Sequence, residues 1–296
     1  MDKKTFYQKG GIVMSKKNKM WLVIATSLVF FGMAMFVIVM SVNEWDFSKL
    51  NTAKYETNTY QISEEFSNIS IKTIRTDIDF EISEDGKCSV VAYEQEKVTH
   101  SVEVIGDTLT ITVNDQREWY EHFGIAINSP KVTIYLPARD YASAIKVKTT
   151  TGDISVEDMS IDSLDVSITT GKVNISNLVC KKSINLDVTT GKVKVSDTEC
   201  ERFTSEGSIG DIILKKVIVE DMLSIERDTG DIEFYNCDAE EIDIEADTGD
   251  ITGSLLTDKK FIAETDTGKI DVPKSGTGGI CKLETDTGDI EVSISN

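Results

Sequence analysis

The sequence lacks the residue patterns on which most catalytic and metal sites are built. It has two histidines in 296 residues, and it contains no GxSxG motif, no HExxH motif and no glycine-rich phosphate loop. Its five cysteines form no CxxC pair and no metal-ligand spacing with His100 or His122. These absences argue against a hydrolase, a nucleotide-binding enzyme and a zinc site. We therefore expect no enzymatic activity and no bound metal of the transition series.

Basic residues are scarce relative to acidic ones. The chain has 31 Lys and Arg against 51 Asp and Glu, which gives a formal net charge of -20. Six lysines and one acid lie in the first 42 residues, so the remainder holds 25 basic and 50 acidic residues. Nucleic acids and anionic lipid head groups are bound through Lys and Arg, so the acidic remainder is not expected to bind either. It would attract cations, basic peptides or cationic components of a cell envelope.

One long run without charge lies near the N-terminus. Residues 20–42 read MWLVIATSLVFFGMAMFVIVMSV, which is long enough to cross a hydrocarbon core of ~30 Å. A cleaved signal peptide has a similar basic start, but its apolar stretch is shorter and ends at a small-residue cleavage site. No A-x-A pattern follows here, so the sequence favours an uncleaved single-pass anchor.

The charges that flank this run predict its orientation. Lys16, Lys17 and Lys19 precede it, whereas Glu44 and Asp46 follow it. Because lysines collect on the cytoplasmic side, we expect a protein of the cell membrane with a cytoplasmic N-terminus and an extracellular C-terminal domain. The predicted order is a basic tail (1–19), a transmembrane helix (20–42), a stalk (43–60), an N-terminal β part (61–140) and a repeat region (141–296).

The repeat region is built on a period of 19 or 20 residues. Segments such as ITTGKVNI, VTTGKVKV and TDTGDIEV recur, and each has an aliphatic residue two positions after the glycine. Apolar and polar residues alternate on both sides of the glycine, which indicates two strands per coil with a corner between them. The sequence therefore predicts an all-β fold, a β-solenoid of about eight coils. The corner glycines are Gly152, Gly171, Gly191, Gly210, Gly230, Gly249, Gly268 and Gly288.

The part before the repeats is also strand-like. Segments FSNISIKT, DIDFEIS and KVTIYLP alternate apolar and polar residues, with turns at 84–86 and 106–107. The pattern fits either a separate β cap or irregular first coils of the same solenoid. Either would cover the N-terminal edge of the stack.

The five cysteines are interpreted as small apolar core residues. Cys180 and Cys200 occupy the same offset in consecutive coils, which would place them ~4.8 Å apart. That spacing allows a disulfide. An inward ladder of unpaired thiols is favoured, because Ile161 and Val219 fill the same column in the neighbouring coils.

The order FSNISIKT, a DTLTITV strand, VTIYLP and then repeated TGDI coils resembles the bacterial β-strand-repeat family known as "putative adhesin". The resemblance covers roughly residues 60–296. It implies a membrane-tethered protein of the cell envelope, sometimes encoded near envelope-stress regulators. It supplies no catalytic residues.

Acidic residues gather around the later corners. If the corners stack, these carboxylates line one edge at ~5 Å, close enough for calcium to bridge them. Against calcium, the sequence lacks the GGxGxDxUx repeat of calcium-binding β-rolls, so a row of solvated corner residues is favoured. The candidate ladder is Asp228, Asp231, Asp247, Asp250, Asp266, Asp286 and Asp289.

These features predict a non-enzymatic, adhesin-like or scaffold module of the cell envelope, with an envelope polymer or a protein as partner. The alternative is an envelope-stress regulatory or protective protein that captures cationic peptides or calcium. The chain ends six residues after its last Asp-Ile pair, at Ser295 and Asn296. We therefore also expect the C-terminal coil to present a free edge for self-association.

Overall fold

The computed structural model describes residues 16–46, 54–119, 128–274 and 276–295, and it divides the chain into two units, Met1–Thr52 and Ala53–Asn296. In the first unit, helix α1 (Lys16–Val42) begins four residues before the predicted span. It is long and apolar enough to cross a membrane, a criterion that a signal sequence near the N-terminus also meets. Its apolar side chains are exposed, except for that of Met40.

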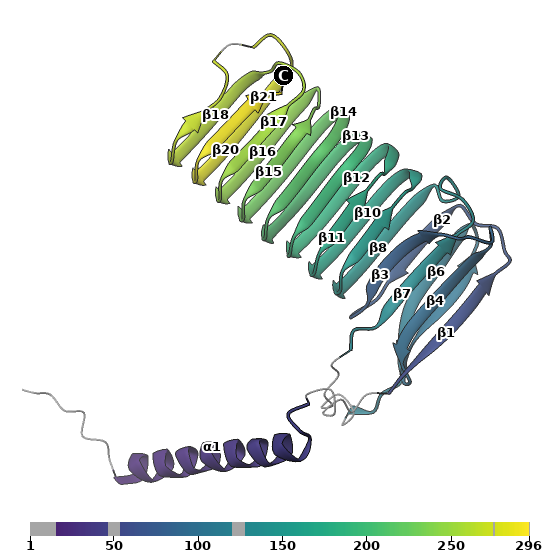
Figure 1. Cartoon of the computed structure of the whole chain (residues 1–296), viewed down its shortest axis with the longest axis vertical. Helices are drawn as coiled ribbons and strands as arrows, with labels where there is room; N and C mark the ends of the chain where they lie inside the picture. The colour runs from purple at the N-terminus through teal and green to yellow at the C-terminus, as the bar shows by residue number, and fades with distance from the viewer. Residues whose placement is uncertain (1–15, 47–53, 120–127, 275, 296) are drawn as a thin grey trace, which may run out of the picture. The chain divides into compact units, whose positions relative to one another are not determined.

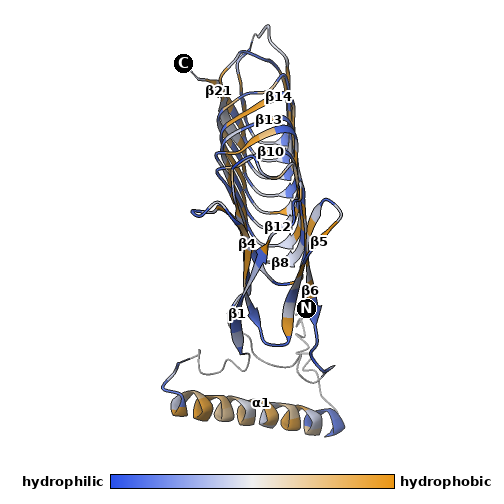
Figure 2. Ribbon diagram, turned by 90° about the vertical axis from the view of Figure 1, so that its right-hand side faces the viewer, coloured by the Kyte–Doolittle hydropathy of each residue, from blue (hydrophilic) through white to orange (hydrophobic). Residues whose placement is uncertain are grey.

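The second unit begins with seven strands that combine both architectures predicted for this part. Strands β2 and β3 pair in parallel with the first repeat strands, so they form a coil of the stack. Strands β1, β4 and β5 run antiparallel to their neighbours and close the end of the stack (Figure 2). The predicted stalk is wrong from residue 55 onward, because β1 starts there and pairs with β4 along its whole length. The seven strands are β1 (Tyr55–Ile62), β2 (Asn68–Lys72), β3 (Asp77–Ile82), β4 (Cys88–Gln95), β5 (Val98–Ile105), β6 (Thr108–Asp115) and β7 (Lys131–Leu136).

The repeat region folds into the predicted β-solenoid, and Figure 1 shows its coils stacked side by side. Within each coil one strand precedes the glycine corner and another follows it, and both pair in parallel with the equivalent strands of adjacent coils. The strands are β8 (Ala144–Thr151), β9 (Ile154–Glu157), β10 (Ser160–Thr170), β11 (Val173–Ser176), β12 (Val179–Thr190), β13 (Val193–Ile209), β14 (Ile212–Thr229), β15 (Ile232–Cys237), β16 (Glu241–Thr248), β17 (Ile251–Leu255), β18 (Lys260–Thr267), β19 (Ile270–Asp271), β20 (Ile280–Thr287) and β21 (Ile290–Ile294).

The glycine corners are required by the close approach of neighbouring coils. Gly191 has a φ of 150°, which side-chain-bearing residues rarely adopt. A Cβ atom at this position would lie 1.6 Å from the carbonyl oxygen of Gly171 in the adjacent coil. Glycine therefore recurs at this corner, because any other amino acid there would force the backbone to move.

The coils have a second corner that was not predicted from the sequence, because it contains no glycine. Its residues have φ values between 47° and 56°, in the left-handed region that Asn and Asp tolerate better than most residues. The side chain of Asn177 bonds that of Asp158, and Lys216 forms an ion pair with Asp197 at 3.2 Å. The second-corner residues are Asp158, Asn177, Asp197, Lys216 and Asn236.

The solenoid interior consists of stacked aliphatic columns, as predicted. The residues two positions after the glycines are fully buried in every coil but one. Gly253 interrupts another column because the ring of Phe234 fills its space: a Cβ atom at 253 would lie 2.6 Å from that ring. The large side chain of Phe234 is thus accommodated by the lack of a side chain at Gly253 in the next coil.

Arg227 is a charged residue that lies inside the solenoid. Arg227 is only 1% exposed, and its guanidinium donates to Ser205 Oγ at 3.0 Å. Gly207, in the adjacent coil, leaves room for it: a Cβ atom there would meet the guanidinium at 2.3 Å. Nε of Arg227 has no hydrogen-bond partner, and burial lowers the pKa of Arg227 to about 10. The buried charge is therefore only partly compensated.

The last two coils are stacked in the reverse of their order in the sequence. Strand β16 pairs with β20 rather than with β18, and β17 pairs with β21. Strands β18 and β19 pair with the outer edges of β20 and β21. The prediction of a free edge on the C-terminal coil is therefore wrong for most of that coil: β18 covers β20, β19 covers the first two residues of β21, and β18 with β19 forms the end of the stack (Figure 1). Within the described residues, 292–294 of β21 extend beyond β19.

Candidate functional site

The Asp residues that follow the corner glycines form a continuous hydrogen-bonded ladder. The amide of Asp250 donates to Asp231 Oδ1 at 3.0 Å, and the amide of Asp289 donates to Asp250 Oδ1 at 2.8 Å. The ladder ends where the amide of Lys269 donates to Asp289 Oδ1 at 2.8 Å. Each of these carboxylates therefore accepts a backbone amide of the next coil, which explains why Asp suits this position.

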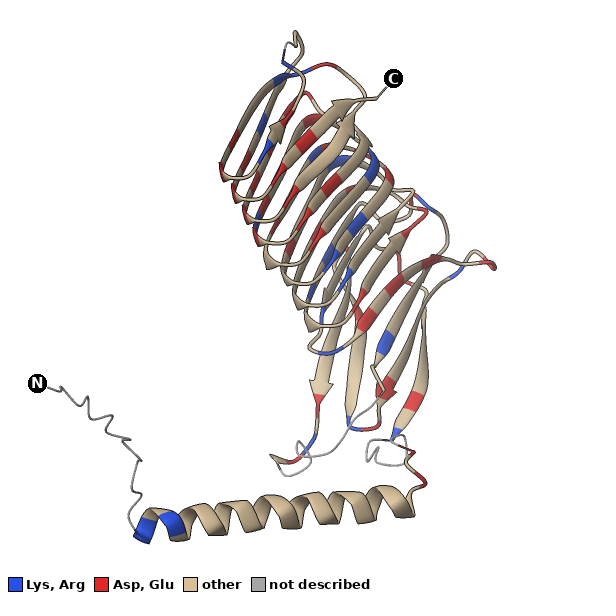
Figure 3. Ribbon diagram, turned by 60° about the vertical axis from the view of Figure 1, so that its left-hand side comes forward, with Lys and Arg blue, Asp and Glu red and all other residues tan. Residues whose placement is uncertain are grey.

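The Asp residues that lie two positions before the glycines form a second, separate row. All four are exposed, and reversal of the last coils sets their order in the stack. Figure 3 shows acidic residues along the corners of these coils. The row runs Asp228, Asp247, Asp286, Asp266.

The structure thus brings the seven predicted carboxylates into two rows on one edge. Among the residues with described positions, no three His, Cys, Asp or Glu side chains converge as metal ligands would. That these corner residues are solvated rather than calcium-bound stays a prediction.

Acidic residues of the middle coils form ion pairs, whereas within the described residues none of the seven corner carboxylates does. Lys146 contacts Asp165 at 2.7 Å, and Lys192 contacts Asp211 at 3.0 Å. Both pairs join adjacent coils on the outer surface. Because exposed pairs of this kind contribute little to stability, their main effect is to neutralise the middle of the rod. Away from these corners the last coils also have ion pairs, such as Lys259 with Asp238 at 2.8 Å. The negative field is therefore strongest around the corners of the last coils.

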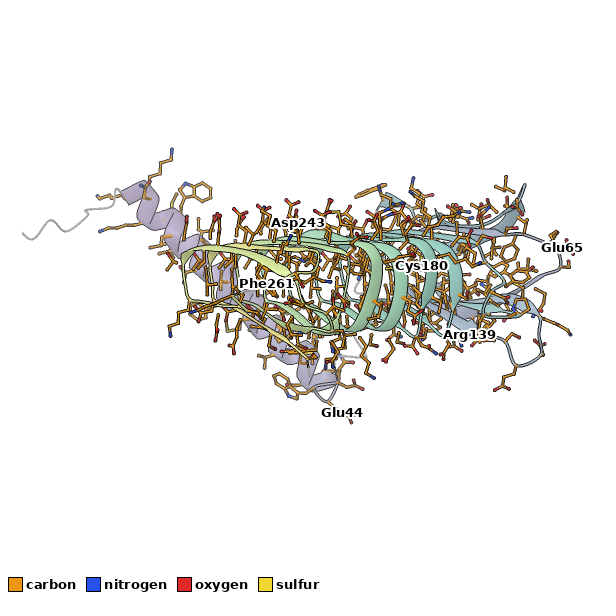
Figure 4. The ribbon with its side chains drawn as sticks, turned by 90° about the horizontal axis from the view of Figure 1, so that it is seen from above. Glu44, Glu65, Arg139, Cys180, Asp243 and Phe261 are labelled. Carbon is orange, nitrogen blue, oxygen red and sulfur yellow. The ribbon has the colours of Figure 1, made fainter. Side chains whose placement is uncertain are left out.

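The cysteines are buried free thiols, as predicted. Cys180 and Cys200 are register partners in adjacent coils and form the expected inward ladder without a disulfide. Burial raises the pKa of Cys200 to about 12, so its reactive thiolate is suppressed at neutral pH. Cys180, labelled in Figure 4, lies in the middle of the stack.

A polar cluster that sequence analysis missed closes the N-terminal end of the stack. Glu94 is fully buried, and its Oε2 contacts His100 Nδ1 at 2.7 Å. His100 Nε2 lies 3.3 Å from Thr76 Oγ1. Tyr60 of edge strand β1 donates to the His100 carbonyl oxygen at 3.0 Å, which joins β1 to β5 at the closed end. Asn58 completes the cluster by donating to Glu94 Oε1 at 2.7 Å.

The hydroxyl–imidazole–carboxylate order resembles the hydrogen-bond chain of a serine or threonine hydrolase, but its surroundings do not. The amides of Thr76 and Asp77 both donate to carbonyl oxygens, of Thr151 and Pro130, so neither can stabilise an oxyanion. The adjoining cavity measures about 60 Å³, far below the ~300 Å³ of a small ligand site. The cluster therefore acts as a polar plug of the closed end.

A sequence signal for this plug does exist. Strand β4 alternates inward Cys88, Val90 and Ala92 with outward residues, and Glu94 continues the inward series. A carboxylate on an inward position needs a partner. His100 lies just beyond the hairpin turn, and its imidazole can supply that partner.

At the opposite end of the stack, the described residues form no such closure. Ile270 is 45% exposed, although its counterparts in the other coils are fully buried. Phe261, labelled in Figure 4, also belongs to an interior column and is only partly covered. On the outer surface of the same coil, Ile262 is 48% exposed. We call the uncovered coil β18–β19 the tip.

Beside the tip lies a recess of about 930 Å³. It opens where β19 stops at Asp271, while β21 continues to Ile294. Pro273 follows two residues later, and a proline has no amide hydrogen with which to extend the pairing. The tip therefore combines an open interior, exposed apolar side chains and unpaired strand edge.

A solved structure with a TM-score of 0.50 shares this fold at low sequence identity, and further matches have lower scores. A "putative adhesin" from Bacteroides fragilis is 19% identical, with a TM-score of 0.50, over 82% of this chain and 97% of that one. A "putative lipid binding protein" from Parabacteroides distasonis is 14% identical, with a TM-score of 0.44, over 83% and 98%. A "putative cell adhesion protein" from Clostridium sporogenes is 14% identical, with a TM-score of 0.35, over 82% and 100%. Among curated proteins there is no significant match.

A family model covers nearly the whole of the second unit. The model described as Toastrack DUF4097 matches residues 66–296, more than three quarters of the chain, from just after β1 through every coil of the stack. With a match of that extent over the fold described above, the chain belongs to the Toastrack DUF4097 family.

Proposed function

We propose that this protein is a membrane-anchored interaction module of the cell envelope, non-enzymatic and adhesin-like, which binds its partner through the tip. Helix α1 provides the anchor, and the lysines before it favour a cytoplasmic N-terminus with an extracellular solenoid. The partner is an envelope polymer or a protein.

One observation carries the proposal: the two ends of the stack are finished differently. The end at which the chain enters is closed by antiparallel strands and a buried polar cluster. The tip leaves interior residues such as Phe261 and Ile270 partly uncovered. Solenoids normally need a cap at each end, so an uncapped end marks a surface that another molecule covers. The description of the Bacteroides fragilis structure as a "putative adhesin" agrees with this proposal.

The acidic corners support a second candidate function, the capture of cationic peptides or calcium in a regulatory or protective role. It rests on the two rows of carboxylates near the tip, only one of which is occupied by backbone amides. Electrostatic capture is screened by salt, whereas contact through apolar side chains is not. This difference separates the two candidates.

The test is cosedimentation of the full chain, reconstituted in lipid nanodiscs, with isolated bacterial envelopes across a salt and calcium series. Two variants that add the same charge are compared: Ile262→Lys at the tip, and Ile209→Lys, which is 56% exposed in the middle of the rod. The proposal predicts retention that survives salt and is lost only in Ile262→Lys. Retention that disappears at modest salt, equally in both variants, would favour cation capture. Unchanged salt-resistant retention in Ile262→Lys would rule out the tip.

A further inference from the structure

We infer that the partner of the tip is a second copy of this chain, paired with it through antiparallel association of the two β18 strands. This inference rests on the proposed role of the tip as a binding surface and specifies the occupant. The sequence predicted self-association through the C-terminal coil and gave no orientation or register. Here the pairing strand is β18, and both its antiparallel orientation and its register are specified.

Strand β18 has a free edge long enough for such pairing. Its eight residues, KFIAETDT, pair on one side with β20, from Lys260↔Ile280 to Thr267↔Thr287. Within the described residues, no strand pairs with its other side. The strand contains no proline, and it has no bulge in its pairing with β20. Its free edge therefore offers backbone donors and acceptors to another strand.

The faces of β18 restrict how a second copy can pair. Phe261, Ala263 and Thr265 are the partly buried, inward residues, whereas Lys260, Ile262, Glu264 and Asp266 are exposed. Residues directly opposite in an antiparallel pair lie on the same face. A symmetric pair that joins the two interiors must therefore be centred on a residue rather than between two residues.

Centring the pair on Ala263 gives a self-complementary register. Lys260 then lies opposite Asp266 of the second copy, and the reciprocal pair occurs at the other end. On the inner face, Phe261 lies opposite Thr265, and Ala263 lies opposite its own copy. Seven residues of each strand are paired, from 260 to 266.

The neighbouring registers are less favourable. Centring on Glu264 would place that carboxylate against its own copy, which like-charge repulsion disfavours. Centring on Ile262 would reduce the paired segment to residues 260–264 and leave Asp266 without a cation opposite. Charge and length together select the register centred on Ala263.

A second copy would also complete the open interior. In the two-fold arrangement each tip covers the other's interior column, so Ile270 and Phe261 would lose the exposure that they have in the single chain. Two-fold pairing through one self-complementary patch is the commonest form of protein association. In such a pair the two β1 strands lie at opposite ends of the doubled stack.

The test uses charge reversal in the full chain, held as single copies in nanodiscs, with pairing of discs measured by sedimentation velocity. In Lys260→Asp, two acids face each other at both ends of the pair; in Asp266→Lys, two lysines do. Each variant alone should pair at least roughly tenfold more weakly than the parent chain. An equimolar mixture of the two restores both ion pairs and should recover pairing. Lys194→Asp, an exposed lysine of β13, is the matched control and should pair like the parent.

Failure of the parent chain to pair, or failure of the mixture to recover, would overturn the inference. Thermal melting of each variant shows whether the coil stays folded, and recovery in the mixture cannot arise from unfolded chains. Failure of this inference can be distinguished from failure of the proposed function. If the parent stays single but envelopes still retain it and release Ile262→Lys, the tip binds another partner and only the inference is lost.

Discussion

The amide of Gly249 donates a hydrogen bond to the carbonyl oxygen of Thr287 at 2.9 Å, so its corner stacks on a coil two repeats further along the chain. The coil between them in sequence lies outside: the amide of Gly288 donates to the carbonyl oxygen of Thr267 at 3.0 Å. The C-terminal coil is thus held on both sides, and the preceding coil becomes the tip. This order decides which strand edge is free.

Cross-linking within one column tests the coil order. Glu245, Glu264 and Glu284 share an offset from their glycines, and Glu284 is the register partner of both others. Glu245→Cys with Glu284→Cys should place two thiols one strand spacing apart, at ~5 Å, and should be joined by a short thiol-specific cross-linker. Glu245→Cys with Glu264→Cys should resist it, since twice that distance separates them. Cross-linking of the second pair alone would show the coils in sequence order.

Gly191→Ala tests the close approach at the corner. The new Cβ atom would lie 1.6 Å from the Gly171 oxygen, so the coils must separate, and we expect a loss of about 3 kcal/mol or more in the free energy of unfolding. Gly106→Ala is the control: its φ of 63° is also left-handed, but a Cβ atom there meets nothing within 4 Å. It should cost about 1 kcal/mol. Equal losses in urea denaturation would show that backbone strain, rather than coil contact, requires glycine.

Arg227→Met tests the cost of the buried charge. Methionine fills a similar volume without a guanidinium that lacks partners, so the thermal midpoint should stay the same or rise. Arg227→Ala should lower it by several degrees, because a cavity remains beside Gly207. A marked loss of stability in Arg227→Met, measured by calorimetry, would indicate that the charge itself holds the coils together.

The acidic ladder should act as a structural element without calcium. In Asp250→Asn the side-chain oxygen can still accept the amide of Asp289, so stability should be retained, whereas Asp250→Ala should lose about 1 kcal/mol or less. Addition of calcium or of a chelator should leave the melting temperature of the parent chain unchanged. A calcium-dependent rise in the parent that is absent in Asp250→Asn would establish a calcium site instead.

The repeat pattern was sufficient to predict most of the fold. Glycine spacing set the coil length, and the alternation around it identified the inward columns that the structure buries, such as those of Val193 and Ile212. It could not reveal the order of the last coils. TDTGKIDV and TDTGDIEV present nearly the same faces to a neighbour, so either could stack on β16.

The signal for the reversed order lies in the segment that links these two coils. Gly276, Gly278 and Gly279 all pass close to backbone, with carbonyl oxygens of Lys259, Asp258 and Glu240 within 2 Å of an added Cβ atom. Three glycines in one link let the backbone pass this close to the neighbouring coils. The polar plug was missed for a different reason: Glu94 and Thr76 meet His100 only through tertiary pairing of separate hairpins.

Hydrogen exchange of the full chain in nanodiscs, with and without isolated envelopes, tests the role of the tip most directly. Amides on the free edge of β18 and at the ends of β19 and β21 should exchange fastest within the stack when the chain is alone. If the tip is the binding surface, envelopes should slow exchange over residues 260–271 and leave the middle coils unchanged. Protection confined to the acidic corners or the closed end, with the tip still exchanging freely, would contradict the account.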